Sequence, residues 1–239
     1  MISFIIPTKN EEKVIEKILT CLSEYKGEKE IIVSDGGSTD KTIEIVKKFT
    51  NKIIGYKGDA RQTIGQGRNA GAKIATGDFF VFIDADVYVP DINNFFMKIE
   101  KIFESNKNII GVTVPIRVLK DQENFMDKVV FSTLNLFHLI LNNYFKIGVA
   151  AGEFQMIRKE IFGKTGGYRE DLAASEDYEF FRKISKIGKT YFIKNLTIYH
   201  TGRRAHKIGW PRLLTEWALN TLSVLFKKES YSKEWKVIR

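Results

Sequence analysis

The sequence predicts an α/β protein with a mostly parallel central sheet. In the first half of the chain, short apolar runs typical of buried strands alternate with segments whose apolar residues follow the spacing of one helix face. This alternation predicts a parallel sheet that is covered by helices on both faces. Right-handed crossovers then place the carboxyl ends of the strands at one edge, where ligands bind in open α/β sheets.

The elements of the first half follow from apolar spacing and capping residues. Asn10 should cap the first helix, and Glu11 and Glu12 fall in its first turn, where the helix dipole favours acids. The expected helices are residues 10–25 and 38–49, followed by a loop that runs into a helix over residues 65–76. The expected strands are residues 3–8, 30–35, 52–56 and 79–84.

The second half has a less regular pattern. Residues 127–145 are strongly apolar but are interrupted by polar side chains. The expected strands are residues 108–118 and 189–200, and the expected helices, each ended by glycine, are residues 157–168 and 176–188. We therefore expect one α/β domain over residues 1–202, followed by an amphipathic, basic helical extension over residues 203–239.

Composition and charge limit the function classes. The 239 residues are 44% hydrophobic and 28% charged, which is an ordinary globular composition. The single cysteine, Cys21, excludes an intramolecular disulfide framework and fits a reducing compartment. The first residues lack the features of a signal peptide, and the sequence has no long apolar run typical of a transmembrane helix, so we expect a cytoplasmic protein. A net charge of +9 predicts an anionic partner, which could be a nucleotide, a nucleic acid or an acidic lipid.

Two carboxylates, Asp84 and Asp86, follow directly after the apolar run at residues 79–83. Two negative charges this close repel each other unless a cation lies beside them. Carboxylate oxygens are the ligands of Mg²⁺ or Mn²⁺, which usually bind substrate phosphates as well. These residues could instead be ordinary turn residues at the end of a strand, where Asp is common.

Four blocks of the sequence together resemble the family 2 glycosyltransferases. They read FIIPTKNEE, EIIVSDGGSTDKT, GRNAGAKIATGDFFVFIDADV and AAGEFQMIRKEIFGKTGGYREDLAASEDYEFFRKISKIGK, and they extend the resemblance over residues 2–200. The resemblance implies the GT-A fold, a Rossmann-like α/β sandwich. It also implies transfer of a sugar, with inversion, from a nucleotide diphosphate donor to an acceptor. UDP-sugars are the commoner donors in that family, so a UDP-sugar is expected in preference to a GDP-sugar.

The resemblance also implies roles for individual residues of the donor site. The DAD segment is similar to the DxD motif of the family, with Asp86 as the metal ligand and Asp84 nearer the ribose. Asp35 occupies the position that contacts the base, although this chain reads Asp-Gly-Gly-Ser where the family commonly has Asp-Asp-Gly-Ser. The remaining nucleotide-binding residues implied are Pro7, Thr8, Glu11 and Arg68.

The segment SEDYEF resembles the ED motif of the family, which implies that Asp177 is the catalytic base. An inverting transfer needs one base to take the proton of the attacking hydroxyl. Glu176 is expected beside the phosphates or the acceptor, although both acids could simply begin a helix. His200 is a candidate third metal ligand or a structural histidine. Arg203 and Arg204 are expected to hold a phosphate of the donor or acceptor, or to be a solvated pair.

The C-terminal extension is amphipathic and basic. Residues 203–239 contain nine Lys or Arg and three Glu, and the helix expected from Trp210 places its apolar side chains on one side. This pattern is typical of a helix that lies on anionic lipid, so the extension could make a peripheral membrane contact or could instead pack on protein. If it contacts a membrane, a polyprenyl phosphate becomes a candidate acceptor beside a soluble glycan. Two alternative hypotheses for the function are considered. The chain could be a basic nucleic-acid-binding protein, although no stacking motif is found, or another kind of nucleotide-sugar enzyme.

Overall fold

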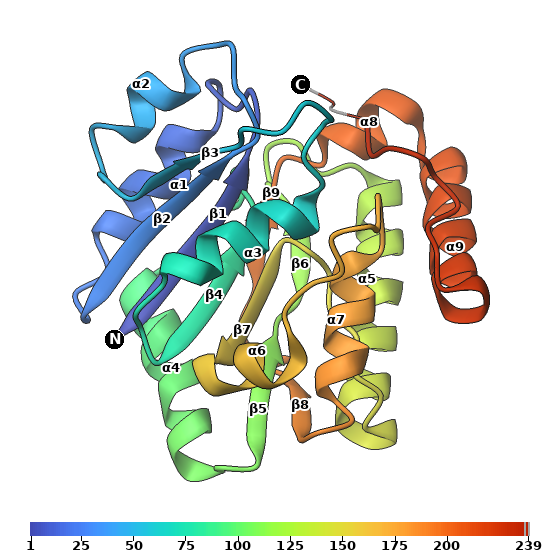
Figure 1. Cartoon of the computed structure of the whole chain (residues 1–239). Helices are drawn as coiled ribbons and strands as arrows, with labels where there is room; N and C mark the ends of the chain where they lie inside the picture. The colour runs from blue at the N-terminus through green and yellow to red at the C-terminus, as the bar shows by residue number, and fades with distance from the viewer. Residues whose placement is uncertain (237, 239) are drawn as a thin grey trace.

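The computed structural model describes residues 1–236 and 238 and shows an α/β fold with a mixed, mostly parallel sheet (Figure 1). Seven strands lie in the order β3-β2-β1-β4-β7-β5-β8, and only β7 runs antiparallel to its neighbours. The prediction of a mostly parallel sheet is therefore confirmed. The strands are β1 (Ile2–Thr8), β2 (Lys29–Asp35), β3 (Ile53–Gly55), β4 (Phe79–Ile83), β5 (Ile109–Thr113), β7 (Phe154–Arg158) and β8 (Lys189–Phe192), and β6 (Ile116–Val118) pairs with β9 (Ile198–His200) in a second sheet.

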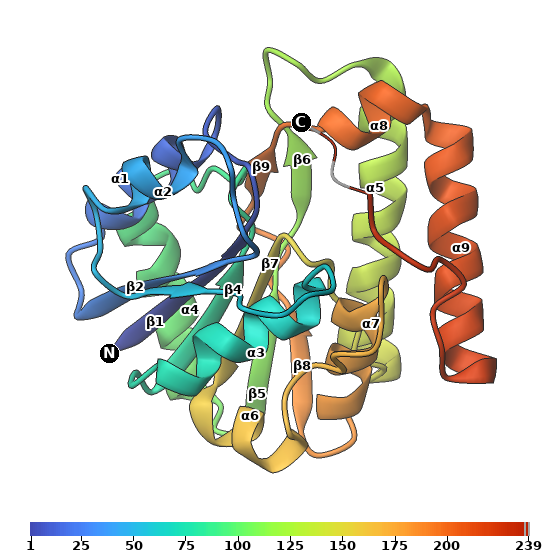
Figure 2. The same ribbon diagram turned by 45° about the horizontal axis from the view of Figure 1, so that its top comes forward.

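Helices cover both faces of the large sheet. The buried cluster on one face contains residues of α1, α2 and α4, and the cluster on the other face contains residues of α3, α6 and α7. Helices α5, α8 and α9 gather at one side of the molecule (Figures 1 and 2). Their bounds are α1 (Ile15–Ser23), α2 (Thr42–Val46), α3 (Ile64–Ile74), α4 (Ile92–Ser105), α5 (Phe125–Leu139), α6 (Lys159–Thr165), α7 (Glu176–Ile184), α8 (Arg203–Ile208) and α9 (Trp210–Lys227), with a π-helical turn at Ile140–Phe145 after α5.

The central strands are apolar on both faces because both faces are covered. In β1, Phe4 and Ile6 belong to one buried cluster and Ile5 to the other. The parallel register places Thr8 beside Asp35, so the carboxyl ends of β1 and β2 meet at one edge. Trp210 belongs to the same cluster as Phe4, so the C-terminal helices share the core of the α/β domain, and the boundary at residue 202 stays a prediction.

Three predictions for the first half were wrong in detail. Helix α1 begins at Ile15, and Asn10 does not cap it, since Asn10 has a positive φ of 55° and its Oδ1 accepts a hydrogen bond from Thr39 N at 2.8 Å. Helix α2 is limited to Thr42–Val46. Helix α3 begins at Ile64, where Thr63 and Gln66 form a capping box, so most of the segment expected to start as a loop is helical from the outset.

The second half differs from the prediction because one strand was missed and two expected strands are each divided. Residues 154–158, part of which was assigned to a helix, form β7 in the middle of the sheet. Residues 108–118 contain β5 and β6, and residues 189–200 contain β8 and β9, which lie in different sheets. Strand β7 has only five residues, includes the polar Gln155 and runs directly into α6, so it lacks the continuous apolar run by which the other buried strands were predicted.

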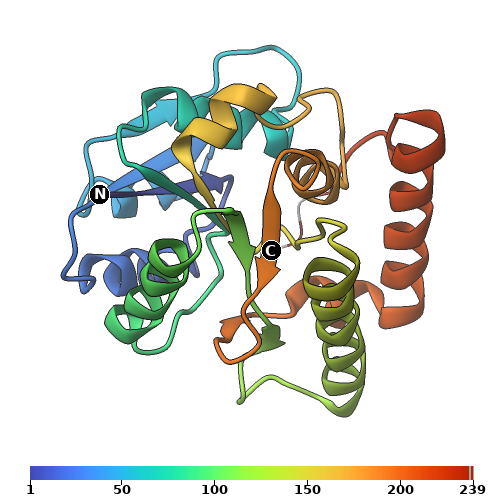
Figure 3. The same ribbon diagram turned by 90° about the horizontal axis from the view of Figure 1, so that it is seen from below.

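Figure 3 views the ribbon from below, on the side of the N-terminus where β1 begins. At that end of β2, Glu30 accepts hydrogen bonds from Ser3 Oγ and Thr76 N and is paired with Lys52. Burial raises the pKa of this carboxyl, but the hydrogen bonds from Lys52, Ser3 and Thr76 outweigh it and lower the pKa to about 2. Glu30 therefore links β1, β2 and the turn that precedes β4.

Replacing Glu30 with Gln should destabilise the fold more at pH 7 than at pH 3. A carboxyl whose folded pKa lies below its unfolded pKa of 4.5 stabilises the fold fully above that value, and the stabilisation is lost as the pH falls towards 2. Urea denaturation of the wild type and the variant at both pH values would measure the difference. An equal loss of stability at both would contradict the assigned role of the ionised carboxylate.

Candidate active site

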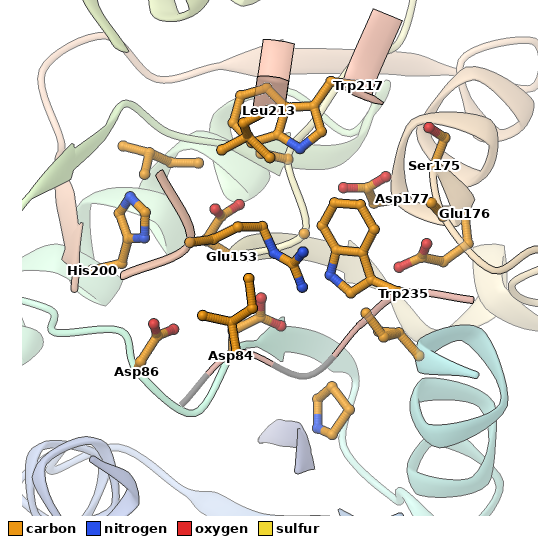
Figure 4. A pocket seen from close by; sticks show the side chains of 18 of the residues that line it. Asp84, Asp86, Glu153, Ser175, Glu176, Asp177, His200, Leu213, Trp217 and Trp235 are labelled. Carbon is orange, nitrogen blue, oxygen red and sulfur yellow. The ribbon is translucent and has the colours of Figure 1, made fainter. Parts of the chain in front are cut away.

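A cavity of about 440 Å³ opens at the carboxyl edge of the sheet (Figure 4). Eleven of the twelve predicted site residues line it, although they come from opposite ends of the chain. They are Pro7, Thr8, Glu11, Arg68, Asp84, Asp86, Glu176, Asp177, His200, Arg203 and Arg204. The strand ends, the start of α7 and the start of α8 therefore converge on one site.

Asp35 is the predicted site residue that does not line this cavity. Its carboxylate is turned into its own loop, where it accepts hydrogen bonds from Gly37 N at 3.1 Å and from Ser38 N at 3.0 Å. Gly36, the next residue, does line the cavity. The role of Asp35 in contacting the base stays a prediction, and these hydrogen bonds show that its carboxylate shapes the loop after β2.

Arg68 organises the carboxylates of the site. It lies in α3, its side chain is 1% exposed, and its guanidinium bonds Glu176 Oε1 at 2.8 Å, Asp84 Oδ1 at 3.2 Å and Gly152 O at 2.9 Å. One buried cation thus joins the end of β4, the segment before β7 and the start of α7. Sequence reasoning placed Arg68 beside the base or phosphates, whereas these contacts show that its charge is already shared between two carboxylates.

The cavity holds more negative charge than Arg68 balances. Removal from water raises the pKa of Asp84 to about 6, against the lowering effect of Arg68. Removal from water and the charge of Asp84 raise the pKa of Glu153 to about 8. Burial also raises the pKa of Glu176 and of Asp177. Several carboxylates in one poorly solvated cavity favour the binding of a cation.

The start of α7 fixes the position of Asp177. Ser175, which precedes the helix, has a φ of 63°, a left-handed conformation that costs energy for a residue with a side chain. A Cβ added at Gly152 would lie 2.6 Å from Arg68 Nη2 and 3.2 Å from Asp177 Oδ2, so glycine permits this close approach. Figure 4 shows Asp86 and His200 on one side of the cavity and Glu176 and Asp177 on the other, while Asp84 lies between them and contacts Arg68, as Glu176 does.

Asp86 and His200 fit a divalent cation. The buried Nε2 of His200 has no hydrogen-bond partner among the described residues, and burial lowers the pKa of the ring, which keeps it neutral at neutral pH. The 3.4 Å contact from Gly202 N to its Nδ1 is long, so either tautomer is accessible. Asp86 Oδ2 accepts a hydrogen bond from Thr201 Oγ1 at 2.6 Å. The described part of the chain contains no group of three such side chains, so substrate oxygens or water would have to complete the coordination.

The two arginines after β9 have different surroundings. Arg203 forms a bidentate pair with Glu11 at 2.6 and 2.8 Å, and its Nε lies 3.4 Å from Asp86 Oδ2. Arg204 stacks on the ring of Trp235 at 3.8 Å. Arg203 therefore joins the first loop of the sheet to the DAD segment. Arg204 faces the C-terminal segment that returns to the cavity.

Comparison with known proteins identifies the family. The model of the family described as Glycosyl transferase family 2 matches residues 3–166, more than half of the chain. The chain belongs to this family. The family 2 enzyme is 30% identical over 223 residues to the Methanococcus voltae protein named dolichyl N-acetyl-alpha-D-glucosaminyl phosphate 3-beta-D-2,3-diacetamido-2,3-dideoxy-beta-D-glucuronosyltransferase. That match covers 84% of this chain and 67% of the relative.

Solved structures confirm the GT-A fold of this family 2 enzyme. The Pyrobaculum calidifontis mannosyltransferase PcManGT in complex with GDP-Man and Mn²⁺ aligns with a TM-score of 0.71 and 20% identity, over 95% of this chain and 63% of that chain. S. aureus TarS residues 1–349 in complex with UDP-GlcNAc align with a TM-score of 0.64 and 22% identity, over 83% of this chain and 57% of that chain. The chain thus spans about three fifths of each of these two structures.

Sequence reasoning missed several residues that line the cavity of this transferase, among them Glu153 and Trp235. Glu153 precedes β7, and the missed strand hid its position. Trp235 reaches the cavity because the segment after α9 folds back, held by paired hydrogen bonds between Ser232 and Asn220. In the sequence, Trp235 lies in a basic segment, and this pattern does not indicate that its side chain reaches the cavity. Figure 4 shows Trp235 between Asp84 and Asp177.

Proposed function

We propose that this family 2 glycosyltransferase transfers a sugar from a nucleotide diphosphate donor, with a UDP-sugar expected in preference to a GDP-sugar, by metal-assisted displacement with inversion. The observation that carries the proposal is the arrangement of the cavity. Asp86 lies on one side of it and Glu176 and Asp177 on the other, with Asp84 between them, where it shares Arg68 with Glu176 (Figure 4). Arg203 joins Asp86 to Glu11 in the loop expected to hold the nucleotide, and an acceptor would bind near Asp177.

Asp177 is the proposed base. The acceptor hydroxyl oxygen attacks the anomeric carbon, its proton passes to a carboxylate oxygen of Asp177, and the bond between that carbon and the diphosphate oxygen breaks. Burial raises the pKa of Asp177, which brings its basicity closer to neutral pH and makes it a better proton acceptor. A direct displacement of this kind requires one base on the acceptor side, which agrees with the separation of Asp177 from Asp86 (Figure 4).

The departing diphosphate needs positive charge beside it. Asp86 and His200 would hold Mn²⁺ or Mg²⁺, which would neutralise charge on the diphosphate oxygens. Arg203 lies beside Asp86 and can approach the same oxygens, while Glu11 fixes its orientation. Arg204, stacked on Trp235, is placed for a second phosphate contact.

A lipid-linked acceptor is the proposed acceptor class, with a soluble glycan as the alternative. The part of the cavity beyond Asp177 is lined by apolar side chains of α5 and α9, which include Phe131, Leu134, Leu213 and Trp217. Apolar walls fit a hydrocarbon chain better than a soluble saccharide. The name of the Methanococcus voltae relative, a transferase acting on a dolichyl phosphate saccharide, supports the same class.

UDP with Mn²⁺ should raise the melting temperature of the protein, and EDTA should abolish the effect. A ligand at 100 times its dissociation constant stabilises a fold by about 2.7 kcal/mol. The replacement Asp86→Ala should remove the shift because the metal loses its carboxylate. The matched control Asp121→Asn changes an exposed carboxylate away from the cavity and should leave it unchanged. A shift that persists in EDTA would contradict the metal role, and a larger shift with GDP would assign the other donor class.

A further inference from the structure

Exposed apolar side chains are concentrated on two helices. Of the eighteen large apolar residues that are exposed in the described part of the chain, nine lie in residues 125–147 and four lie in α9. The remaining five are scattered over the rest of the fold and its C-terminal segment. Single exposed apolar residues are normal, but thirteen gathered in α9 and in α5 with the π-helical turn and segment that follow it mark a binding surface. We call this surface the two-helix face; it comprises Phe125, Met126, Val129, Leu136, Phe137, Ile140, Tyr144, Phe145, Ile147, Leu214, Leu219, Leu222 and Phe226.

The spacing of these residues shows that each helix has an exposed apolar stripe. Phe125, Val129 and Leu136 of α5 and Ile140 of the π-helical turn that follows it recur at helical spacing. In α9, Leu222 and Phe226 are one turn apart, and Phe226 is 81% exposed. Two elements that are far apart in the sequence therefore present apolar side chains to the solvent.

The charged residues of the two helices lie outside or at the border of these stripes. Arg212 and Glu216 of α9 pair with each other at 3.3 Å along one side of the helix. In α5, Asp127 is fully buried and accepts a hydrogen bond from Trp210 Nε1 at 2.8 Å, while Lys128 is exposed at the edge of the stripe. An apolar stripe bordered by basic side chains is well suited to a hydrocarbon boundary with anionic headgroups.

The two-helix face adjoins the acceptor end of the cavity. Figures 1 and 2 both show α5 and α9 at the same side of the molecule, with their axes running in similar directions. The cavity extends between them, since Leu134 and Phe137 of α5 and Leu213 and Trp217 of α9 all line it. Phe137 belongs both to the cavity wall and to the exposed face. The apolar surface is therefore continuous with the wall of the proposed acceptor site.

We propose that the two-helix face docks the enzyme peripherally on an anionic lipid bilayer and that a lipid acceptor passes from the bilayer into the cavity between α5 and α9. The entry of a lipid acceptor into the cavity rests on the proposed function, whereas the docking on the bilayer does not. No helix in residues 1–236 is long and apolar enough to cross a membrane, so contact would be made by the surface of these helices. The sequence predicted a membrane contact through residues 203–239. In the structure, α5 and the segment after it contribute more residues to the two-helix face than the C-terminal extension does.

Charge decides between a bilayer and a second copy of the chain. Lys146 follows the turn after α5, and Lys227 and Lys228 end α9, so basic side chains border the apolar stripes. Residues 203–239 carry nine basic and three acidic side chains. An anionic bilayer complements this charge, whereas a symmetric dimer through the same face would bring the basic groups of two copies together.

Vesicle flotation of the full chain tests the docking. The protein should bind vesicles that contain phosphatidylglycerol more tightly than vesicles of phosphatidylcholine, and salt should weaken the difference. The double replacement Leu136→Ser and Phe226→Ser, one change on each helix, should weaken binding by at least roughly tenfold, because two apolar side chains no longer enter the lipid. The matched control Ile187→Ser changes a residue that is 51% exposed, close to the 56% of Leu136, but lies off the face and should change nothing.

Two further measurements separate the possible failures. The Mn²⁺-dependent shift with UDP reports the donor site, and light scattering after gel filtration reports oligomeric state. If the shift is present but neither vesicle type binds, the docking is overturned and the transferase function stands. If vesicles bind but no nucleotide produces a shift, the docking stands and the donor proposal fails. A dimer that the double replacement converts to a monomer, without vesicle binding, would assign the face to a second copy and overturn the proposal.

Discussion

Replacing Asp177 with Asn should lower the rate of sugar transfer by about 10²- to 10⁴-fold while leaving the UDP- and Mn²⁺-dependent thermal shift intact. Asn has nearly the same shape but cannot accept the proton of the acceptor hydroxyl. Asp177 lies across the cavity from Asp86, so the proposed metal contact should survive (Figure 4). Single-turnover transfer with a radiolabelled donor would measure the rate, and the shift would measure binding in the same preparations.

The control for this experiment is Asp171→Asn, which changes an exposed carboxylate that pairs with Arg169 outside the cavity. Its transfer rate should equal that of the wild type. In the wild type the rate should fall as the pH drops through the pKa of Asp177, which burial holds above the ordinary value for Asp. A transfer rate in Asp177→Asn close to that of the wild type would remove Asp177 from the mechanism and direct attention to Glu153.

The amino-terminal half and the site could be predicted from the sequence for a common physical reason. Strand ends in a parallel sheet converge by topology, so Thr8 and Asp84, which lie far apart in the chain, could be placed together from strand order alone. The motif residues at Asp177 and His200 converge on the same cavity, as the family resemblance implied. Local patterns and strand order together therefore carry most of the information about this edge.

Helix α4 (Ile92–Ser105) was also not predicted, although its buried residues recur at helical spacing. The misses at the cavity and in the middle of the sheet have a different cause, because each depends on contacts distant in the chain. Strand β7 runs antiparallel between β4 and β5, and its short run contains the polar Gln155 and leads directly into α6, so no apolar run marks it as a strand. Glu153 enters the cavity only because β7 begins directly after it. Trp235 enters because Ser230 bonds the backbone of Ala174 and turns the final segment back over the start of α7. Contacts of this kind are set by the packed fold and leave no periodic signal.

Arg68 shows how a residue can lie at the predicted site and still have contacts that the sequence does not indicate. Its place within the matched block gave it a position beside the donor, and it does line the cavity. The sequence could not show that Glu176, 108 residues later, takes one side of its guanidinium and Asp84 the other. The structure therefore adds a second role for Arg68, which is to hold the acidic groups in place. This role predicts an effect on the stability of the fold that a contact with phosphate alone would not produce.

Replacing Arg68 with Met should destabilise the fold by about 3–5 kcal/mol at neutral pH, the usual cost of leaving buried carboxylates without their cation. Glu176 is 5% exposed and bonds Arg68 at 2.8 Å, so it has no route to water when the guanidinium is removed. The matched control Arg182→Met removes an exposed arginine of α7 and should change the free energy of unfolding little. Urea denaturation of the three proteins would measure the differences.

The pH dependence of this loss distinguishes a charge effect from a packing effect. In Arg68→Met the pKa of Glu176, already raised by burial, loses the lowering effect of Arg68 and should rise further. A carboxyl whose folded pKa lies above its unfolded value destabilises the fold at high pH, and protonation relieves this as the pH falls. The deficit of the variant should therefore be smaller at pH 5 than at pH 8. A deficit that is the same at both values would mean that Arg68 acts through its volume, and the carboxylates of the active site would then need another counter-charge.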